Sequence, residues 1–172
     1  RGPYPVCCGR DRRLRGRGFA IGAQGIPGLI FLNLNRAEQN MNDLDKLTVS
    51  SDDSILLIID IQERLAPAIA HHESILEKTG ILVQAAEALG IPVLATEQYP
   101  KGLGPIIAPM QVLFSQMKNF LGVLEKIQFS ALTPEVLAAI QATGRRKVVI
   151  AGMETHVCVF QTARALQAAG YL

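Results

Sequence analysis

Residues 147–169, KVVIAGMETHVCVFQTARALQAA, decide the fold of this chain. An apolar run of strand length, residues 148–151, is followed by a turn at Gly152 and then by a helical pattern with Cys158 in its first turn. Thr155 suits the N-cap of that helix. A thiol there faces unpaired backbone N–H groups and the positive end of the helix dipole, and both favour a thiolate. The stretch predicts a strand, a turn and a helix that carries a reactive cysteine.

The residues before this unit predict a parallel sheet. Residues 54–60, SILLIID, are apolar on both faces, as in a central parallel strand, and end in Asp60. A helix is predicted over residues 72–89 and a strand over residues 92–96, which completes a right-handed βαβ unit. A short third strand, residues 123–127, carries Lys126 near its end. A short turn is predicted within residues 61–70, and a helix over residues 110–121. Another helix is predicted over residues 134–142, with Thr133 as its N-cap. Tyr171-Leu172 is predicted to start a fifth strand.

Charge divides the chain of 172 residues into two parts. Residues 1–40 contain seven arginines and two acids, whereas residues 41–172 carry a net charge of −3. A more ordinary sequence begins at Met41, so we expect one domain over residues 41–172 and a non-domain segment before it. An acidic domain without a basic run argues against nucleic acid as a partner. No apolar run reaches the ~18 residues of a membrane span, which argues against a membrane partner.

The segment of residues 1–40 is rich in arginine and poor in acids, as targeting peptides are, but it lacks a clear amphipathic helix. Three explanations stay open: upstream translation or a fragment artefact, a targeting segment, or a genuine tail. The cysteines are Cys7, Cys8 and Cys158, so residues 41–172 cannot build a disulfide framework, which fits a reducing compartment. We expect a cytoplasmic protein, or a mitochondrial or other organellar one if the segment is a targeting signal.

Three polar residues follow neighbouring strands of the predicted sheet: Asp60, Lys126 and Cys158. Open α/β sheets place their chemistry at the carboxyl ends of the strands. There an acid could remove the thiol proton while a cation supports the negative charge. Each residue also has an ordinary explanation, since a lone cysteine is often a small buried hydrophobe, an aspartate often caps a turn, and a lysine is usually solvated.

Four blocks, ILLIIDIQERL, TEQYPKGLGP, EKIQFSAL and VVIAGMETHVCVFQTA, resemble the isochorismatase-like cysteine hydrolases, in the order found in that family. The second block resembles the isochorismatase domain-containing subgroup. The resemblance implies a three-layer α/β/α fold with a Rossmann-like parallel sheet in the order 3-2-1-4-5-6. It also implies an Asp–Lys–Cys triad at Asp60, Lys126 and Cys158, and hydrolysis of a small amide-type C–N bond through a thioester. A homo-oligomer is expected for the full-length protein.

The same resemblance places a non-proline cis peptide at Met153–Glu154. Together with Thr155, these residues are expected to form the turn that supplies oxyanion donors. We expect substrate contacts from residues at the active edge and in the last helix, namely Glu97, Gln98, Tyr99 and His156. Nicotinamidases have an Asp-x-His metal cluster after the second strand, where this chain reads TEQYP, so neither a metal nor a cofactor is expected. Isochorismatase proper cleaves an enol ether and lacks the cysteine, so Cys158 argues against that reaction for this chain.

Two other classes of function compete with catalysis. A catalytically silent domain that binds partners through the oligomer surface of the family stays open as the alternative. A nucleotide-binding module would need a glycine-rich turn after the first strand, where residues 60–65 read DIQERL. Family members continue past Leu172 with a fifth and a sixth strand. We therefore interpret the domain as partial and expect an exposed edge on the fourth strand, with a cost in stability.

Overall fold

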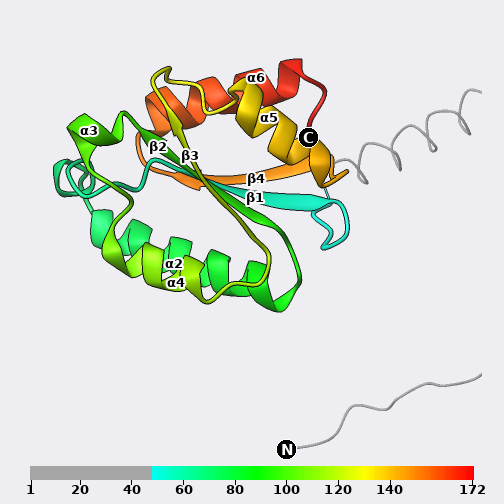
Figure 1. Ribbon diagram of the computed structural model, residues 1–172, viewed down its shortest axis with the longest axis horizontal. Helices are drawn as coiled ribbons and strands as arrows, with labels where there is room; N and C mark the ends of the chain where they lie inside the picture. Colours follow the sequence, from blue (N-terminus) through cyan, green and yellow to red (C-terminus); the bar gives the residue numbers. More distant parts are fainter. Residues whose placement is uncertain (1–47) are drawn as a thin grey trace, which may run out of the picture. The chain divides into compact units, whose positions relative to one another are not determined.

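In the computed structural model, which describes residues 48–172, the strands form a parallel sheet in the order β3-β2-β1-β4. The strands are β1 (Ser54–Ile59), β2 (Val93–Gln98), β3 (Phe120–Lys126) and β4 (Lys147–Gly152). Figure 1 shows helices covering both faces of this sheet, so the predicted three-layer α/β fold and the order of the first four strands are confirmed. The predicted non-domain segment, residues 1–40, lies outside the described residues.

One pair of helices covers each face of the sheet (Figure 1). The helices α2 (His72–Ala88) and α4 (Ala108–Ser115) lie on one face, and α5 (Pro134–Ala142) and α6 (Phe160–Ala168) lie on the other. The shorter elements are η1 (Ala66–Ala68), α3 (Pro100–Leu103) and the π-helical turn η2 (Thr155–Val159). In the described part of the chain, no helix has the length and apolarity that crossing a bilayer requires.

The central strand β1 explains why both faces need helices. All six of its residues are buried. Leu56 and Ile58 pack with residues of α2 and α4, whereas Ile55, Leu57 and Ile59 pack with residues of α5 and α6. Side chains alternate between the faces of a strand, so a strand that is apolar throughout has to be covered on both sides. The interpretation of residues 54–60 as a central strand is confirmed.

Two helix boundaries follow the signals in the sequence. The helix α2 ends where predicted, since Gly90 has a φ of 66° and the backbone N–H of Ile91 donates to Ala86 O at 2.8 Å. Thr133 caps α5 by accepting a hydrogen bond from the backbone N–H of Val136 at 3.3 Å. The helix predicted over residues 110–121 is shorter and begins earlier, because Phe120 and the residues after it join β3.

The strands β2 and β3 are longer than the apolar pattern indicates. Gln98 ends β2, two residues after the predicted end, and pairs in register with Lys126 at the end of β3. The ladder continues through Glu97 and Glu125, whose polar side chains interrupt the apolar pattern without interrupting the backbone pairing. The extension places Gln98 directly beside Lys126.

The outer edge of β4 is partly paired at its beginning. The backbone N–H of Leu172 donates to Arg146 O at 3.0 Å, and the N–H of Val148 donates to Leu172 O at 2.7 Å. Two hydrogen bonds that flank one residue in this way are the pattern of a parallel ladder. Tyr171-Leu172 therefore approaches β4 as the start of a fifth strand would, although it is not itself a regular strand.

Candidate active site

The carboxyl edge of the sheet brings together three of the predicted site residues. Asp60 directly follows β1, Lys126 ends β3, and Cys158 lies in η2 after β4. Lys126 Nζ lies 2.6 Å from Asp60 Oδ2 and 3.6 Å from Cys158 Sγ. Asp60, Lys126 and Cys158 are only 0%, 3% and 1% exposed. A capping aspartate or a solvated lysine is therefore excluded, and the cysteine is not merely a hydrophobe, because it touches a buried cation.

The backbone at Asp60 turns sharply as it leaves β1. Asp60 has a φ of 55°, a left-handed conformation that aspartate tolerates better than most residues. Its N–H donates to Thr96 O at 3.2 Å, and the Thr96 hydroxyl donates to Asp60 Oδ1 at 2.9 Å. Thr96, on the adjacent strand β2, thus holds both the backbone of Asp60 and its carboxylate. Sequence reasoning missed Thr96, because a threonine at the end of an apolar strand gives no signal of this role.

The turn before Cys158 differs from the prediction. The described residues contain no cis peptide bond, so the cis peptide expected at Met153–Glu154 is wrong. The chain reverses instead through Glu154, whose φ of 59° and ψ of 62° are left-handed. Thr155 is not the N-cap, because Glu154 occupies that position and residues 155–159 form a π-helical turn. Such turns are frequent at functional sites.

A glycine lets β4 approach β1 next to this turn. A Cβ atom on Gly152 would lie 2.3 Å from Ile59 O, too close for any side chain. Met153 is buried, and its backbone N–H donates to Ile59 O at 3.2 Å. The close approach fixes the start of η2 relative to Asp60. The predicted role of residues 153–155 in supplying oxyanion donors stays a prediction.

Burial raises the pKa of the Cys158 thiol to about 11, and a hydrogen bond to Asp60 and its negative charge add to this effect. The positive charge of Lys126 acts in the opposite direction, and Glu154 raises the pKa further. The expectation of a resting thiolate is therefore wrong. A position at the amino terminus of a helix lowers the pKa of a thiol, but desolvation and the neighbouring carboxylate raise the pKa of Cys158 by more. The resting site has a neutral thiol next to an Asp60–Lys126 ion pair.

Alkylation of Cys158 is accordingly expected to be slow at neutral pH and to accelerate up to about pH 11. Iodoacetamide reacts with the thiolate, whose fraction rises about tenfold per pH unit below the pKa. The rate would be measured by mass spectrometry in a Cys7→Ala/Cys8→Ala background, which leaves Cys158 as the single thiol. The same chain unfolded in urea is the control, with a midpoint near pH ~8.5. A native midpoint at or below that of the unfolded chain would contradict the raised pKa.

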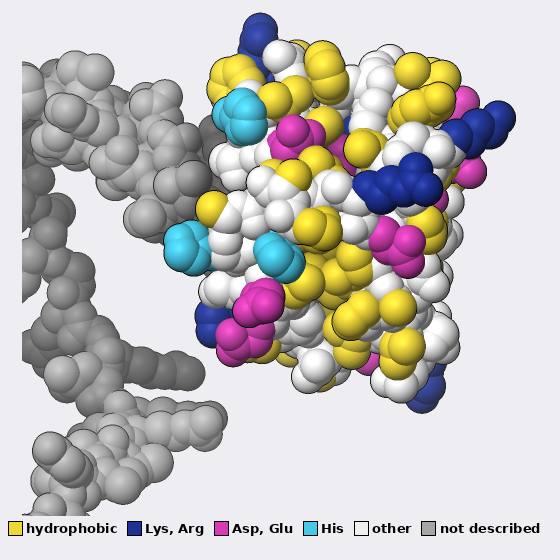
Figure 2. All heavy atoms as spheres, turned by 90° about the vertical axis from the view of Figure 1, so that its left-hand side faces the viewer, with side chains coloured by type: hydrophobic (Ala, Val, Ile, Leu, Met, Phe, Trp, Pro, Cys, Tyr) yellow, Lys and Arg dark blue, Asp and Glu magenta, His cyan; other side chains and the backbone are white. Residues whose placement is uncertain are grey.

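The structure gives the four residues predicted to contact substrate different surroundings. Glu97 anchors the following loop, because its Oε1 accepts from the backbone N–H of Ile106 at 2.6 Å. Gln98 binds Lys126, with Oε1 at 2.7 Å from Nζ. Tyr99 and His156 are exposed, and Figure 2 shows histidine side chains at the surface on the side of the molecule that carries the carboxyl edge, with both hydrophobic and acidic side chains near them. Contact of any of them with substrate stays a prediction.

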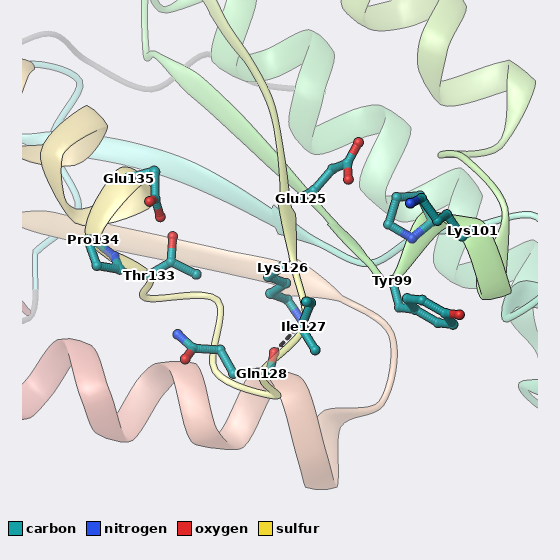
Figure 3. A pocket seen from close by; sticks show the side chains of 10 residues that line it. Tyr99, Lys101, Glu125, Lys126, Ile127, Gln128, Thr133, Pro134 and Glu135 are labelled. Atoms are coloured by element: carbon teal, nitrogen blue, oxygen red, sulfur yellow. Dashed lines mark hydrogen bonds between the residues drawn. The ribbon is translucent and has the colours of Figure 1, made fainter.

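A cavity of about 460 Å³ lies beside the site, at the carboxyl end of β3. In Figure 3, Tyr99 and Lys101 border it on one side and Thr133 and Glu135 on the other, with Lys126 between them. Asp60 and Cys158 do not line it. Of the three residues at the carboxyl edge, Lys126 alone lines the cavity. Within residues 48–172, no group of three or more His, Cys, Asp or Glu side chains could hold a metal ion, and the expectation of no metal or cofactor stays a prediction.

Comparison with known proteins identifies the family. A model of the isochorismatase domain matches residues 54–172. The chain belongs to the isochorismatase family. It is 41% identical over 119 residues to isochorismatase domain-containing protein 1 of Salmo salar and 36% identical over 119 residues to isochorismatase domain-containing protein 2 of Xenopus laevis. These matches cover 69% of this chain but only 40% and 55% of the two relatives.

Solved structures of this family share the fold. The MAR1 ribonuclease of Caenorhabditis elegans has a TM-score of 0.65 and 32% identity, over 72% of this chain and 62% of that one. YcaC of Escherichia coli, described as an octameric hydrolase of unknown specificity, has a TM-score of 0.62 and 22% identity, over 72% of this chain and 61% of that one. The likeness to these two structures shows the fold of the chain.

Proposed function

We propose that this chain carries the catalytic centre of a cysteine hydrolase that cleaves a small amide-type C–N bond through a thioester on Cys158. The observation that carries the proposal is the buried Asp60–Lys126 ion pair, with Nζ 3.6 Å from Sγ. A neutral thiol beside a carboxylate is a nucleophile with its base already in place. The positive charge of Lys126 balances the negative charge as it moves from the carboxylate to the sulfur and on to the substrate.

The reaction runs in two halves. Asp60 accepts the thiol proton as Sγ attacks the carbonyl carbon, and the C–N bond breaks when Asp60 returns that proton to the departing nitrogen. The products of this half are a thioester on Cys158 and free ammonia or an amine. Asp60 then takes a proton from water, which attacks the thioester and releases a carboxylic acid, while the recovered proton restores the thiol. Burial of all three groups strengthens each electrostatic step.

The test is to capture the thioester. The chain would be incubated with a panel of small primary and secondary amides, and release of ammonia or amine would be measured. Samples quenched in acid at early times would be mapped by mass spectrometry. We expect the acyl group on the peptide that contains Cys158. Release of amine with no acyl group on that peptide, in the first turnover or later, would contradict covalent catalysis by Cys158.

Two alternatives give different outcomes in the same experiment. The silent interaction domain predicts neither release of amine nor acylation. RNA cleavage is raised by the name of the C. elegans relative, but residues 41–172 carry a net charge of −3 and the thiol is 1% exposed, which disfavours binding of a polyanion. Adding a labelled RNA to the panel separates this activity from amide hydrolysis.

A further inference from the structure

We propose that Gln98 is a positioning residue for Lys126, and that Gln62 in turn fixes Gln98, so that two side-chain amides hold the site lysine in place. This inference rests on the proposed function, in which Lys126 supports the charge on Cys158. It replaces the prediction from the sequence that Gln98 contacts substrate. Because Gln98 and Gln62 are neutral amides, they hold Lys126 without adding a charge to the group formed by Asp60, Lys126 and Cys158.

The contacts of Lys126 show what Gln98 does. Its ammonium group has three N–H donors, and the two shortest contacts are Asp60 Oδ2 at 2.6 Å and Gln98 Oε1 at 2.7 Å. The remaining contacts are longer: Cys158 Sγ at 3.6 Å, Gln128 O at 3.4 Å and Phe129 O at 3.3 Å. Two acceptors therefore fix two of the three donor directions. The third donor is left for the side of the site that holds the sulfur and the two loop carbonyls.

The orientation of the Gln98 amide is determined by its partners. Its Nε2 donates to Ile127 O at 2.6 Å, and a carbonyl oxygen can only accept. The Oε1 atom must therefore face Lys126, whose ammonium group can only donate. The backbone supports the same arrangement, since Gln98 and Lys126 pair in register and the N–H of Tyr99 donates to Lys126 O at 2.8 Å.

Gln62 holds the backbone of Gln98 as a neighbouring strand would. Its Oε1 accepts from the N–H of Gln98 at 2.8 Å, and its Nε2 donates to Gln98 O at 3.0 Å and to Gly104 O at 2.6 Å. Gln62 is 0% exposed, and it lies two residues after Asp60. The contacts thus form a closed path: the chain leaving β1 carries both Asp60 and Gln62, and both reach Lys126, one directly and one through Gln98.

A carboxylate at position 98 would not hold Lys126 in the same way. It would place a second negative charge against Lys126 and compete with the charge that develops on Cys158. A neutral amide holds the ammonium group without altering the charge balance of the triad. The amide also has its own donor for Ile127 O, which a carboxylate lacks.

The experiment compares Gln98→Leu with Gln141→Leu, a control at an exposed position in α5. We expect Gln98→Leu to lower kcat about tenfold with KM changed less than twofold, because a positioning residue acts on the transition state. The rate of Cys158 alkylation at pH 9 should fall about threefold, because a displaced Lys126 stabilises the thiolate less. Gln141→Leu should change neither quantity.

The outcomes distinguish a positioning role of Gln98 from a substrate-contact role. A raised KM with unchanged kcat would restore the substrate-contact role of Gln98 and overturn the proposal, as would an unchanged alkylation rate. The alkylation rate needs no turnover, so it tests the position of Lys126 even if amide hydrolysis fails. Gln62→Leu should reproduce the effect of Gln98→Leu, and the double variant should be no worse than either single one. If Gln62→Leu does not fold, Gln98→Leu alone decides the main claim.

Discussion

Replacing Cys158 with alanine is expected to abolish amide hydrolysis and leave the fold intact. In enzymes with covalent catalysis, loss of the nucleophile lowers kcat by about 10⁴-fold to 10⁶-fold. The structural cost is small, because the change removes one buried sulfur atom and leaves the backbone contact in which the Thr162 hydroxyl donates to Cys158 O at 2.6 Å. The measurement is amine release at saturating substrate, together with thermal unfolding of the variant.

Cys158→Ser sharpens this experiment. Serine keeps nearly the same shape but is a far weaker nucleophile in a site with a carboxylate base, so it should lose almost as much activity as alanine. The Cys7→Ala/Cys8→Ala chain is the matched control for loss of a thiol, and its activity should equal that of the starting chain. Turnover by Cys158→Ala above a hundredth of that control would show that another group carries the reaction.

Replacing Lys126 with methionine is expected to reduce the free energy of unfolding by about 3–5 kcal/mol. Both side chains of the Asp60–Lys126 pair are 0% exposed, so methionine would leave the Asp60 carboxylate buried without its cation. Thr96 would still donate to Oδ1, but a neutral hydroxyl cannot replace the charge. Urea-induced unfolding, followed by circular dichroism, would measure the difference.

Two further variants show where that cost comes from. In Lys126→Met/Asp60→Asn the buried charge is gone as well, so part of the lost stability should return. Lys78→Met is the control for losing a lysine from an ion pair, because its partner Glu77 is solvated and both side chains are 65% exposed. Such surface pairs contribute little. If Lys126→Met were no less stable than Lys78→Met, the buried pair would not be a stabilising element of the fold.

Much of the fold and the site could be predicted from local patterns. The apolar run of β1 indicated a central strand, and the rule that parallel strands bring their carboxyl ends to one edge placed Asp60, Lys126 and Cys158 together. The features that failed depend on long-range contacts. The ladder to Gln98 is set by β3, not by the residues of β2, and the thiol pKa is set by burial and by a carboxylate from another strand.

The turn before Cys158 is a second feature that depends on long-range contacts. The preference of threonine for N-cap positions predicts Thr155 as the N-cap of the last helix, whereas Glu154 occupies that position and the first turn is π-helical. The close packing of Gly152 on Ile59 sets where this turn begins, and a single strand read from sequence does not reveal it. Gln62 and Thr96 were missed for a related reason, since their side chains act across strand boundaries that the sequence does not show.

The neighbouring positions of β1 and β4 also affect how the protein is made. Their junction joins segments far apart in the chain, as the hydrogen bond between Asp53 and Arg146 across 93 residues shows. A ribosome adding ~5–20 residues per second needs roughly 5–20 s to synthesise that interval. Until β4 arrives, the apolar strand β1 has an open edge and Cys158 has not been made. Nascent chains of this protein therefore pass through a stage in which an apolar strand edge is open to pairing with other chains.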